Sequence, residues 1–262
     1  MIKNKLHSHL VRISVTLSLS ITFIPYQAQA QTPTRIQTAT RETFEEALTI
    51  QFEPPPGKNK PGQTAGGATR GQCSLQQQDS NKPLTLLTPA NQEGLTIAER
   101  PTFFFYVPHA SIEQAEFTLI SQDEEYAYQT NFSLESKGGV FQFQLPAEAP
   151  PLEVGKNYQW SVALICDQQE RTEDIVVQGQ IKRTEANPNL FAQLKSATPF
   201  QSAALYGKAG LWYDMVKALA ELQLAEPNNS NLVTAWKQLL QSEYVKLDDI
   251  SQAPILYCCS TN

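Results

Sequence analysis

The chain has 262 residues, of which 41% are hydrophobic and 18% charged, and its formal net charge is −6 at pH 7. This acidic balance, without any basic stripe, argues against binding to nucleic acid, because an acidic surface repels phosphate backbones. The length suffices for one large or two small domains, each with its own core.

The first 30 residues have the pattern of a secretory signal peptide. The pattern comprises a basic start, an apolar run and a small-x-small cleavage site: Lys3, Lys5 and Arg12, then residues 10–24, then Ala28-Gln29-Ala30. The apolar run is shorter than the about 20 residues of a transmembrane helix. We therefore expect cleavage after Ala30, no stable membrane span in the mature chain, and a periplasmic or extracellular location.

Residues 31–72 are rich first in Thr and Gln and then in Pro and Gly, with few side chains to bury. This composition predicts a flexible lead-in. The glycines within residues 62–67 are followed by Ala68 and Thr69 rather than by the Lys-Ser/Thr of a phosphate-binding loop. The pattern thus favours a loop over a nucleotide site, and we expect no cofactor.

Residues 73–184 change to an apolar period of two, with turn residues between short runs. Eight strands are predicted, at residues 84–87, 95–98, 102–107, 115–121, 126–134, 140–145, 158–166 and 175–181. This spacing is typical of a sandwich of antiparallel strands. We predict an α+β fold, in which an N-terminal immunoglobulin/fibronectin-like antiparallel β-sandwich is followed by a C-terminal helical segment.

The strand that begins at Tyr158 is the most informative one. Its apolar side chains share one parity, which predicts that Trp160 points into the core. Residues 152–158 also resemble the approach to the tyrosine corner of fibronectin type III domains, with Val154 where proline is usual. In a corner, the Tyr158 hydroxyl bonds to upstream backbone and fixes the crossover between sheets. The alternative is an ordinary half-buried tyrosine.

The chain has four cysteines, which pair by default in an oxidising compartment. Cys73 precedes the first strand and Cys166 lies on a late one, so we predict a disulfide between them. Cys258 and Cys259, near the chain end, could pair between chains, bind nothing or be mobile, and the sequence does not decide among these alternatives.

Residues 185–251 turn to helical spacing after Asn187-Pro188. Leucine and methionine recur at three and four residues over 211–222, and a second apolar stripe covers 232–240, with Pro227 between the two. The segment resembles about one and a half tetratricopeptide repeats, and a plain helix pair docked on the sandwich explains it equally well. Residues 252–262 form a tail.

Several motifs together resemble Domain of Unknown Function 928, a family of exported cyanobacterial proteins. The residues that carry the resemblance are 66–73, Arg100 to Pro108, Tyr158-x-Trp160 with Cys166-Asp167, 209–214 and Asp248-Asp249-Ile250. The resemblance spans about residues 50–251 and brings no assigned activity. Ala68 stands where a third glycine is expected, which argues against a catalytic role at that position.

The catalytic inventory of the mature chain is nearly empty. His109 is its single histidine and no Gly-x-Ser-x-Gly motif exists, so a Ser-His-Asp triad is not indicated. The histidine count excludes multi-histidine zinc sites, and Cys258-Cys259 lack the second pair of a structural site, so we expect no metal. We predict that the protein is not an enzyme and has no catalytic residues.

The acidic and aromatic segment at residues 123–128 is the best remaining candidate for a site. It offers Asp123, Glu124, Glu125, Tyr126 and Tyr128. Paired carboxylates with aromatics can hold calcium or a sugar, and a glycosidase needs two carboxyls about 5 to 10 Å apart. A solvated turn is the competing interpretation.

These observations predict an exported, non-catalytic module that binds or scaffolds an unknown protein of the cell envelope. A carbohydrate- or calcium-binding domain that uses residues 123–128 is the first alternative, and a hydrolase is the second.

Overall fold

The computed structural model describes residues 49–56, 82–91, 93–109, 112–134 and 137–256. These residues all belong to one compact unit, Phe44–Asn262. The predicted signal peptide lies outside the described residues.

The described chain runs from strands to helices. Its elements are β1 (Thr85–Leu86), β2 (Glu93–Thr96), β3 (Thr102–Val107), β4 (Gln114–Ser121), β5 (Ala127–Ser133), β6 (Gly139–Gln144), β7 (Asn157–Leu164), η1 (Arg171–Glu173), β8 (Ile175–Arg183), α2 (Pro188–Leu194), α3 (Pro199–Lys208), α4 (Trp212–Ala225), α5 (Ser230–Leu240), η2 (Asp248–Ile250) and β9 (Ile255–Leu256). Strands therefore overlap all eight of the predicted runs, and helices follow them. No helix in the described ranges has the length and apolar character needed to cross a membrane.

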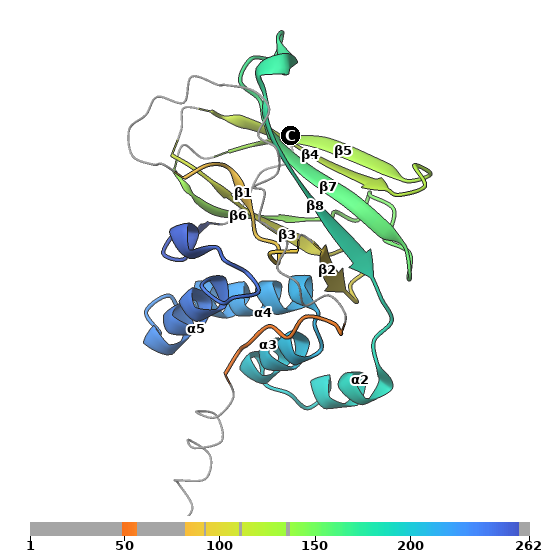
Figure 1. Ribbon diagram of the computed structural model, residues 1–262, viewed down its shortest axis with the longest axis vertical. Coiled ribbons are helices and arrows are strands. Elements are labelled where there is room, and N and C mark those ends of the chain that lie inside the picture. Colours follow the sequence, from red (N-terminus) through yellow and green to blue (C-terminus); the bar gives the residue numbers. More distant parts are fainter. Residues whose placement is uncertain (1–48, 57–81, 92, 110–111, 135–136, 257–262) are drawn as a thin grey trace, which may run out of the picture. The chain divides into compact units, whose positions relative to one another are not determined.

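The strands form two sheets, with orders β1-β3-β6-β9 and β2-β8-β7-β4-β5 (Figure 1). The sheets face each other through aromatic side chains. The ring of Phe117 on β4 lies 4.9 Å from that of Phe103 on β3 and 4.3 Å from that of Phe143 on β6. Trp160 on β7 points into the same layer, 4.8 Å from Phe103. The chain therefore has a β-sandwich-like core, as the period of two predicts.

The prediction of a wholly antiparallel sandwich is wrong at two strand pairs. β2 runs parallel to β8, and β9 runs parallel to β6. Parallel neighbours need long connections. The chain supplies them, because five strands separate β2 from β8 and the helices lie between β6 and β9. Strand β9 itself lies within residues 252–262, the predicted tail.

The tyrosine corner is confirmed. The Glu153 backbone N–H donates a hydrogen bond of 2.8 Å to the Tyr158 hydroxyl, five residues downstream. This bond lies where the chain leaves β6 in one sheet and enters β7 in the other. The hydroxyl thus fixes the crossover between the sheets, as this motif does elsewhere.

Helix α4 closes the sandwich on the side of β2 and β3. Tyr213, near its start, reaches between the sheets, where Trp160 Nε1 donates to its hydroxyl at 2.8 Å and the hydroxyl donates to the Gln180 carbonyl at 2.9 Å. Trp212 Nε1 donates to the Leu87 carbonyl at 2.8 Å. A Cβ at Gly94 would lie 2.4 Å from the Tyr213 ring, so β2 needs glycine there.

Residues 49–56 lie against the helices, although the sequence predicts a flexible lead-in over this stretch. Ile50 and Phe52 are each only 4% exposed, and the Phe52 ring meets Trp212 edge-on at 5.1 Å. The Glu53 N–H donates to the Gly207 carbonyl at 3.0 Å. The two apolar side chains and this backbone hydrogen bond therefore hold the short segment against the helices, despite the prolines that follow.

Candidate functional site

The acidic residues 123–125 form the turn between β4 and β5, and their carboxylates do not leave an open coordination site. Instead, Lys156 lies among them. Its Nζ is 3.2 Å from Asp123 Oδ2, 3.5 Å from Glu125 Oε2 and 3.2 Å from Glu153 Oε1. Glu124 is the exception: its backbone has a φ of 60°, and its side chain has no ion pair with Lys156 among the described contacts.

Hydrogen bonding and charge shift the pKa values in this turn. The Ser121 hydroxyl and then Lys156 stabilise the Asp123 carboxylate, which lowers its pKa. Glu153 and Asp123 hold Lys156 in its charged form and raise its pKa. Lys156 thus offsets one of the three negative charges around it, and a calcium ion bound there would have to displace the lysine ammonium.

The two tyrosines of the predicted site have different environments. Tyr126 is 8% exposed, its hydroxyl donates to the Pro150 carbonyl at 3.0 Å, and its ring packs edge-on against Tyr158 at 5.3 Å. Burial raises the pKa of Tyr126 to about 12. Tyr128 lies on β5 and is half-buried against the core. Tyr126 therefore belongs to the core and offers no open face for a sugar ring.

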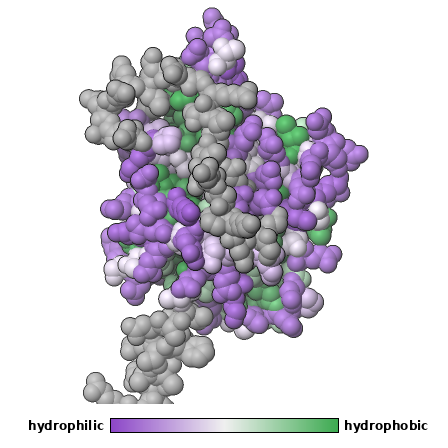
Figure 2. All heavy atoms as spheres, viewed as in Figure 1, coloured by the Kyte–Doolittle hydropathy of each residue, from purple (hydrophilic) through white to green (hydrophobic). Residues whose placement is uncertain are grey.

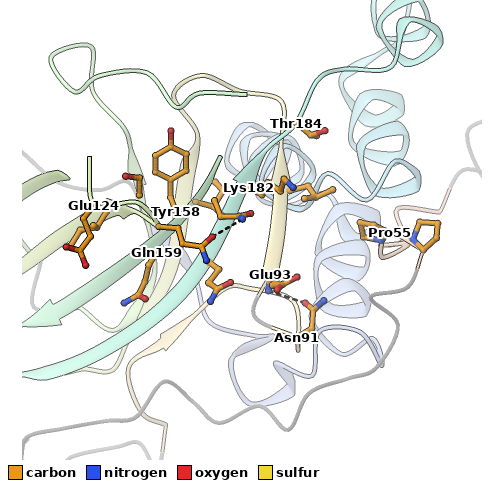
Figure 3. Close-up of a pocket in the computed structure, with 16 residues that line it drawn as sticks. Pro55, Asn91, Glu93, Glu124, Tyr158, Gln159, Lys182 and Thr184 are labelled. Atoms are coloured by element: carbon orange, nitrogen blue, oxygen red, sulfur yellow. Dashed lines mark hydrogen bonds between the residues drawn. The ribbon is translucent and has the colours of Figure 1, made fainter. Parts of the chain in front are cut away.

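A groove of about 770 Å³ lies beside this turn, along one end of the five-stranded sheet (Figure 3). Its lining comes from β2, β8, β7 and the end of β4, and Pro55 and Pro56 flank it. Glu124 is the only residue of the predicted segment 123–128 that lines this groove. The structure thus separates Glu124 from the carboxylates around Lys156.

Amide side chains dominate the polar lining of the groove. They are Asn91, Gln122, Asn157, Gln159 and Gln180. Asn157 Nδ2 donates to Gln122 Oε1 at 3.2 Å, and the Glu93 N–H donates to Asn91 Oδ1 at 3.2 Å. Because each amide both donates and accepts, this surface suits a neutral polar ligand better than an ion.

A second cavity of about 650 Å³ lies between α3, α4 and the β2–β3 connection. Asp214 lines it and accepts the Ile97 N–H at 3.1 Å. Burial of the carboxyl raises the Asp214 pKa from 3.8 to about 6, although bonds from Thr96 and Ile97 partly oppose the shift. These bonds tie the start of α4 to the end of β2, which is a structural role.

The remaining predicted residues do not join either cavity. His109 is exposed in the β3–β4 connection. Cys166 carries no free thiol, but Cys73 lies outside the described residues, so their pairing stays a prediction. Cys258 and Cys259 also lie outside them. Within the described ranges, no group of three acidic, histidine or cysteine side chains could hold a metal ion.

The groove and the role of Lys156 were not predicted from the sequence. The outward parity of β7 and β8 already places Asn157, Gln159 and Gln180 on one face of the sheet, so this signal was present. Lys156 precedes β7 by one residue and meets the acidic turn only because β4 pairs with β7, bringing Ser121 opposite Tyr158. Such a contact depends on strand order.

No curated protein matches the chain. Among solved structures it is similar to the fn3 domain of human collagen alpha-1(XX) chain, at 12% identity and a TM-score of 0.26, over 42% of this chain and 87% of that one. The family model "Domain of Unknown Function (DUF928)" matches residues 65–255, and the chain therefore belongs to this family.

Proposed function

We propose that the chain is a non-catalytic binding or scaffolding module of the cell envelope, and that the amide-lined groove is its contact surface for a protein partner. The groove itself is the main support, because it combines five neutral amides with the apolar side chains of Leu95 and Ile120. Protein interfaces also combine apolar contacts with polar groups that fix orientation. The proposal includes that the protein is exported and that its sandwich is of the immunoglobulin/fibronectin type.

Three carboxylates outside the groove are engaged in structural contacts. Asp123 and Glu125 are engaged by Lys156, and the Asp214 carboxyl is bonded to the backbone of Ile97 in the other cavity. A hydrolase needs an acid or base that can reach its substrate. Among the described residues that line the groove, Glu124 and Glu93 carry carboxylates, so these are the groups that the hydrolase alternative would have to use.

A carbohydrate ligand is the second candidate, and the same amides favour it. Sugar hydroxyls both donate and accept hydrogen bonds, and amide side chains match them in both directions. The proposed sugar site lies in the groove beside Glu124 and not on the ring of Tyr126, which is buried. Calcium is a weaker fit because Lys156 already lies between the carboxylates.

Affinity capture from envelope extract tests the proposal. The bait is the chain with Gln159→Ala and Gln180→Ala, compared with the unchanged chain and with a control carrying Gln142→Ala and Gln178→Ala. The control glutamines lie on strands β6 and β8 but outside the groove. We expect the groove variant alone to lose a retained protein, identified by mass spectrometry.

Three other outcomes would change the conclusion. Equal retention by the groove and control variants would remove the groove from the proposal. Binding to a glycan array that is lost only in the groove variant would establish the carbohydrate alternative. Substrate turnover that His109→Ala abolishes would replace the binding function with an enzymatic one.

A further inference from the structure

Strand β5 is the last strand of the five-stranded sheet, at the end opposite to β2. It pairs with β4, and no other described strand lies beside its second edge (Figure 1). This edge is separate from the groove, whose lining residues include none from β5. The following inference therefore goes beyond the proposed binding function and does not depend on it.

The hydrogen-bond phase of the β4–β5 pair shows which backbone groups face the free edge. Ser121 N–H donates to the Tyr126 carbonyl at 3.0 Å, and Leu134 N–H donates to the Glu113 carbonyl at 2.8 Å. In antiparallel pairs, bonded and non-bonded positions alternate. The even-numbered residues of β5 therefore bond to β4. The odd-numbered ones, Ala127, Gln129, Asn131 and Ser133, direct their N–H and C=O groups outward.

This edge lacks the features that normally prevent strands from associating. Sheet edges are usually protected by charged side chains, proline, bulges or covering segments. β5 reads Ala-Tyr-Gln-Thr-Asn-Phe-Ser, without a charge or a proline, although 18% of the chain is charged. Its register with β4 runs without interruption from Gln114–Ser133 to Ile120–Ala127, so no bulge bends it away. The edge is open to another strand.

The sequence of β5 is complementary to itself when two copies run antiparallel about Thr130. This register uses all seven residues of the strand. On the outer face it places Gln129 opposite Asn131 and Ala127 opposite Ser133. On the inner face it places Tyr128 opposite Phe132, and Thr130 opposite itself. Aromatic and Thr–Thr pairs across strands are favourable, and no like charges meet within the strand. The amides of Gln129 and Asn131 can also donate and accept hydrogen bonds.

We propose that two copies of this chain associate through β5, in antiparallel register about Thr130, so that the five-stranded sheet of one copy continues into that of the other. The four outward residues of each strand then bond to those of its partner. Such a contact is isologous and closes on itself as a two-fold dimer. The carbonyl of Asn131, which now accepts a long 3.4 Å bond from the Thr130 hydroxyl, would accept from the partner strand instead.

Sedimentation velocity of the natively processed chain, over a range of concentrations, measures this association. We expect the sedimentation coefficient to rise from monomer to dimer. Gln129→Pro removes an N–H that faces the free edge and leaves the ladder with β4 intact, so it should abolish the dimer. The double change Gln129→Lys and Asn131→Lys should do so by charge. Gln178→Lys, on the outer face of β8, is the matched control and should dimerise normally.

Cross-linking tests the register. Thr130→Cys places two thiols opposite each other at a non-hydrogen-bonded pair, where Cβ atoms approach closely enough for a disulfide. We expect a covalent dimer on a non-reducing gel for Thr130→Cys and none for Ser133→Cys, whose partner would be Ala127. Far-UV circular dichroism establishes that each variant is folded.

The proposal is overturned by a chain that stays monomeric at every concentration. It is also overturned by a dimer that survives both β5 variants, by a dimer that Gln178→Lys abolishes as well, or by cross-linking through Ser133→Cys in preference to Thr130→Cys.

Discussion

Two polar networks in this protein have opposite environments. At the junction between the sandwich and α4, neutral groups of Trp160, Tyr213 and Gln180 bond to one another away from water. At the β4–β5 turn, Lys156 forms solvent-exposed ion pairs with three carboxylates. Buried polar groups are costly when they lose a partner, whereas exposed ion pairs contribute little. We expect the first network to hold the fold together and the second to arrange only its turn.

The largest effect is expected at Tyr213. Tyr213→Ala removes a buried ring and leaves Trp160 Nε1 and the Gln180 carbonyl without their partner, so the free energy of unfolding should fall by about 3 to 5 kcal/mol. Tyr213→Phe keeps the ring and should cost about 1 to 3 kcal/mol. Urea unfolding measures both. Phe191→Ala, at a side chain that is 54% exposed, is the control and should change little.

Asp214 lies between these extremes, since its carboxyl is desolvated but hydrogen-bonded. Its pKa is about 6 in the folded protein against 3.8 ordinarily, so the folded state binds the proton more tightly. Its contribution to stability is therefore present below pH 4 and is lost as the pH rises to about 6. A shift of this size corresponds to about 3 kcal/mol, and we expect roughly half because the residue is partly exposed.

The measurement for Asp214 is urea unfolding at several pH values. Relative to wild type, Asp214→Asn should remove the loss of stability between pH 4 and pH 6, because the amide does not titrate. Asp249→Asn, at an exposed position, should keep the wild-type slope. Identical pH profiles for wild type and Asp214→Asn would contradict the assignment.

The tyrosine corner should have a moderate effect. Tyr158→Phe removes the hydroxyl that accepts the Glu153 N–H and leaves the ring packed against Tyr126. We expect a loss of about 1 kcal/mol in the free energy of unfolding. Tyr128→Phe, on β5 of the same sheet, serves as the comparison. If the corner does not stabilise the fold, the two variants should have equal free energies of unfolding.

The smallest effect on stability is expected at Lys156. Lys156→Met should leave urea unfolding unchanged at physiological salt, because the ion pairs are exposed and screened. The pKa of Asp123, followed by NMR titration, should nevertheless rise. Ser121→Ala alone should raise the Asp123 pKa more than Lys156→Met does, since the serine hydroxyl is the larger cause of the lowered value. The reverse order would show that charge, not hydrogen bonding, dominates at this turn.

Local patterns predicted most of the fold. All eight predicted runs overlap strands, and the Tyr158 corner is present, because strand periodicity and turn motifs act over a few residues. The parallel pairs β2–β8 and β6–β9 could not be predicted, since they depend on segments far apart in the chain. The packing of Ile50 and Phe52 was missed for the same reason. The Pro- and Gly-rich composition of the surrounding segment predicts a flexible stretch, but the burial of these two side chains depends on helices far along the chain.

The candidate site likewise has a part that local sequence predicts and a part that depends on distant contacts. The acidic turn was located correctly between two strands, but its chemistry depends on Lys156, which reaches it through the pairing of β4 with β7. The raised pKa of Asp214 likewise requires β2 and α4 to be adjacent. A titratable group can be found in a sequence, but the neighbours that shift its pKa depend on which strands and helices lie side by side.

The bond between Trp212 and Leu87 joins residues 125 positions apart in the chain. Tyr213 lies in the same core as the strands, and β9 completes the edge beside β6 only near residue 255. Topologies dominated by such distant contacts fold slowly, because long loops must close before the contacts reward them. During synthesis, the strands emerge well before the helix that closes them. We therefore expect the β-rich part to complete its folding only after the last fifth of the chain has been synthesised.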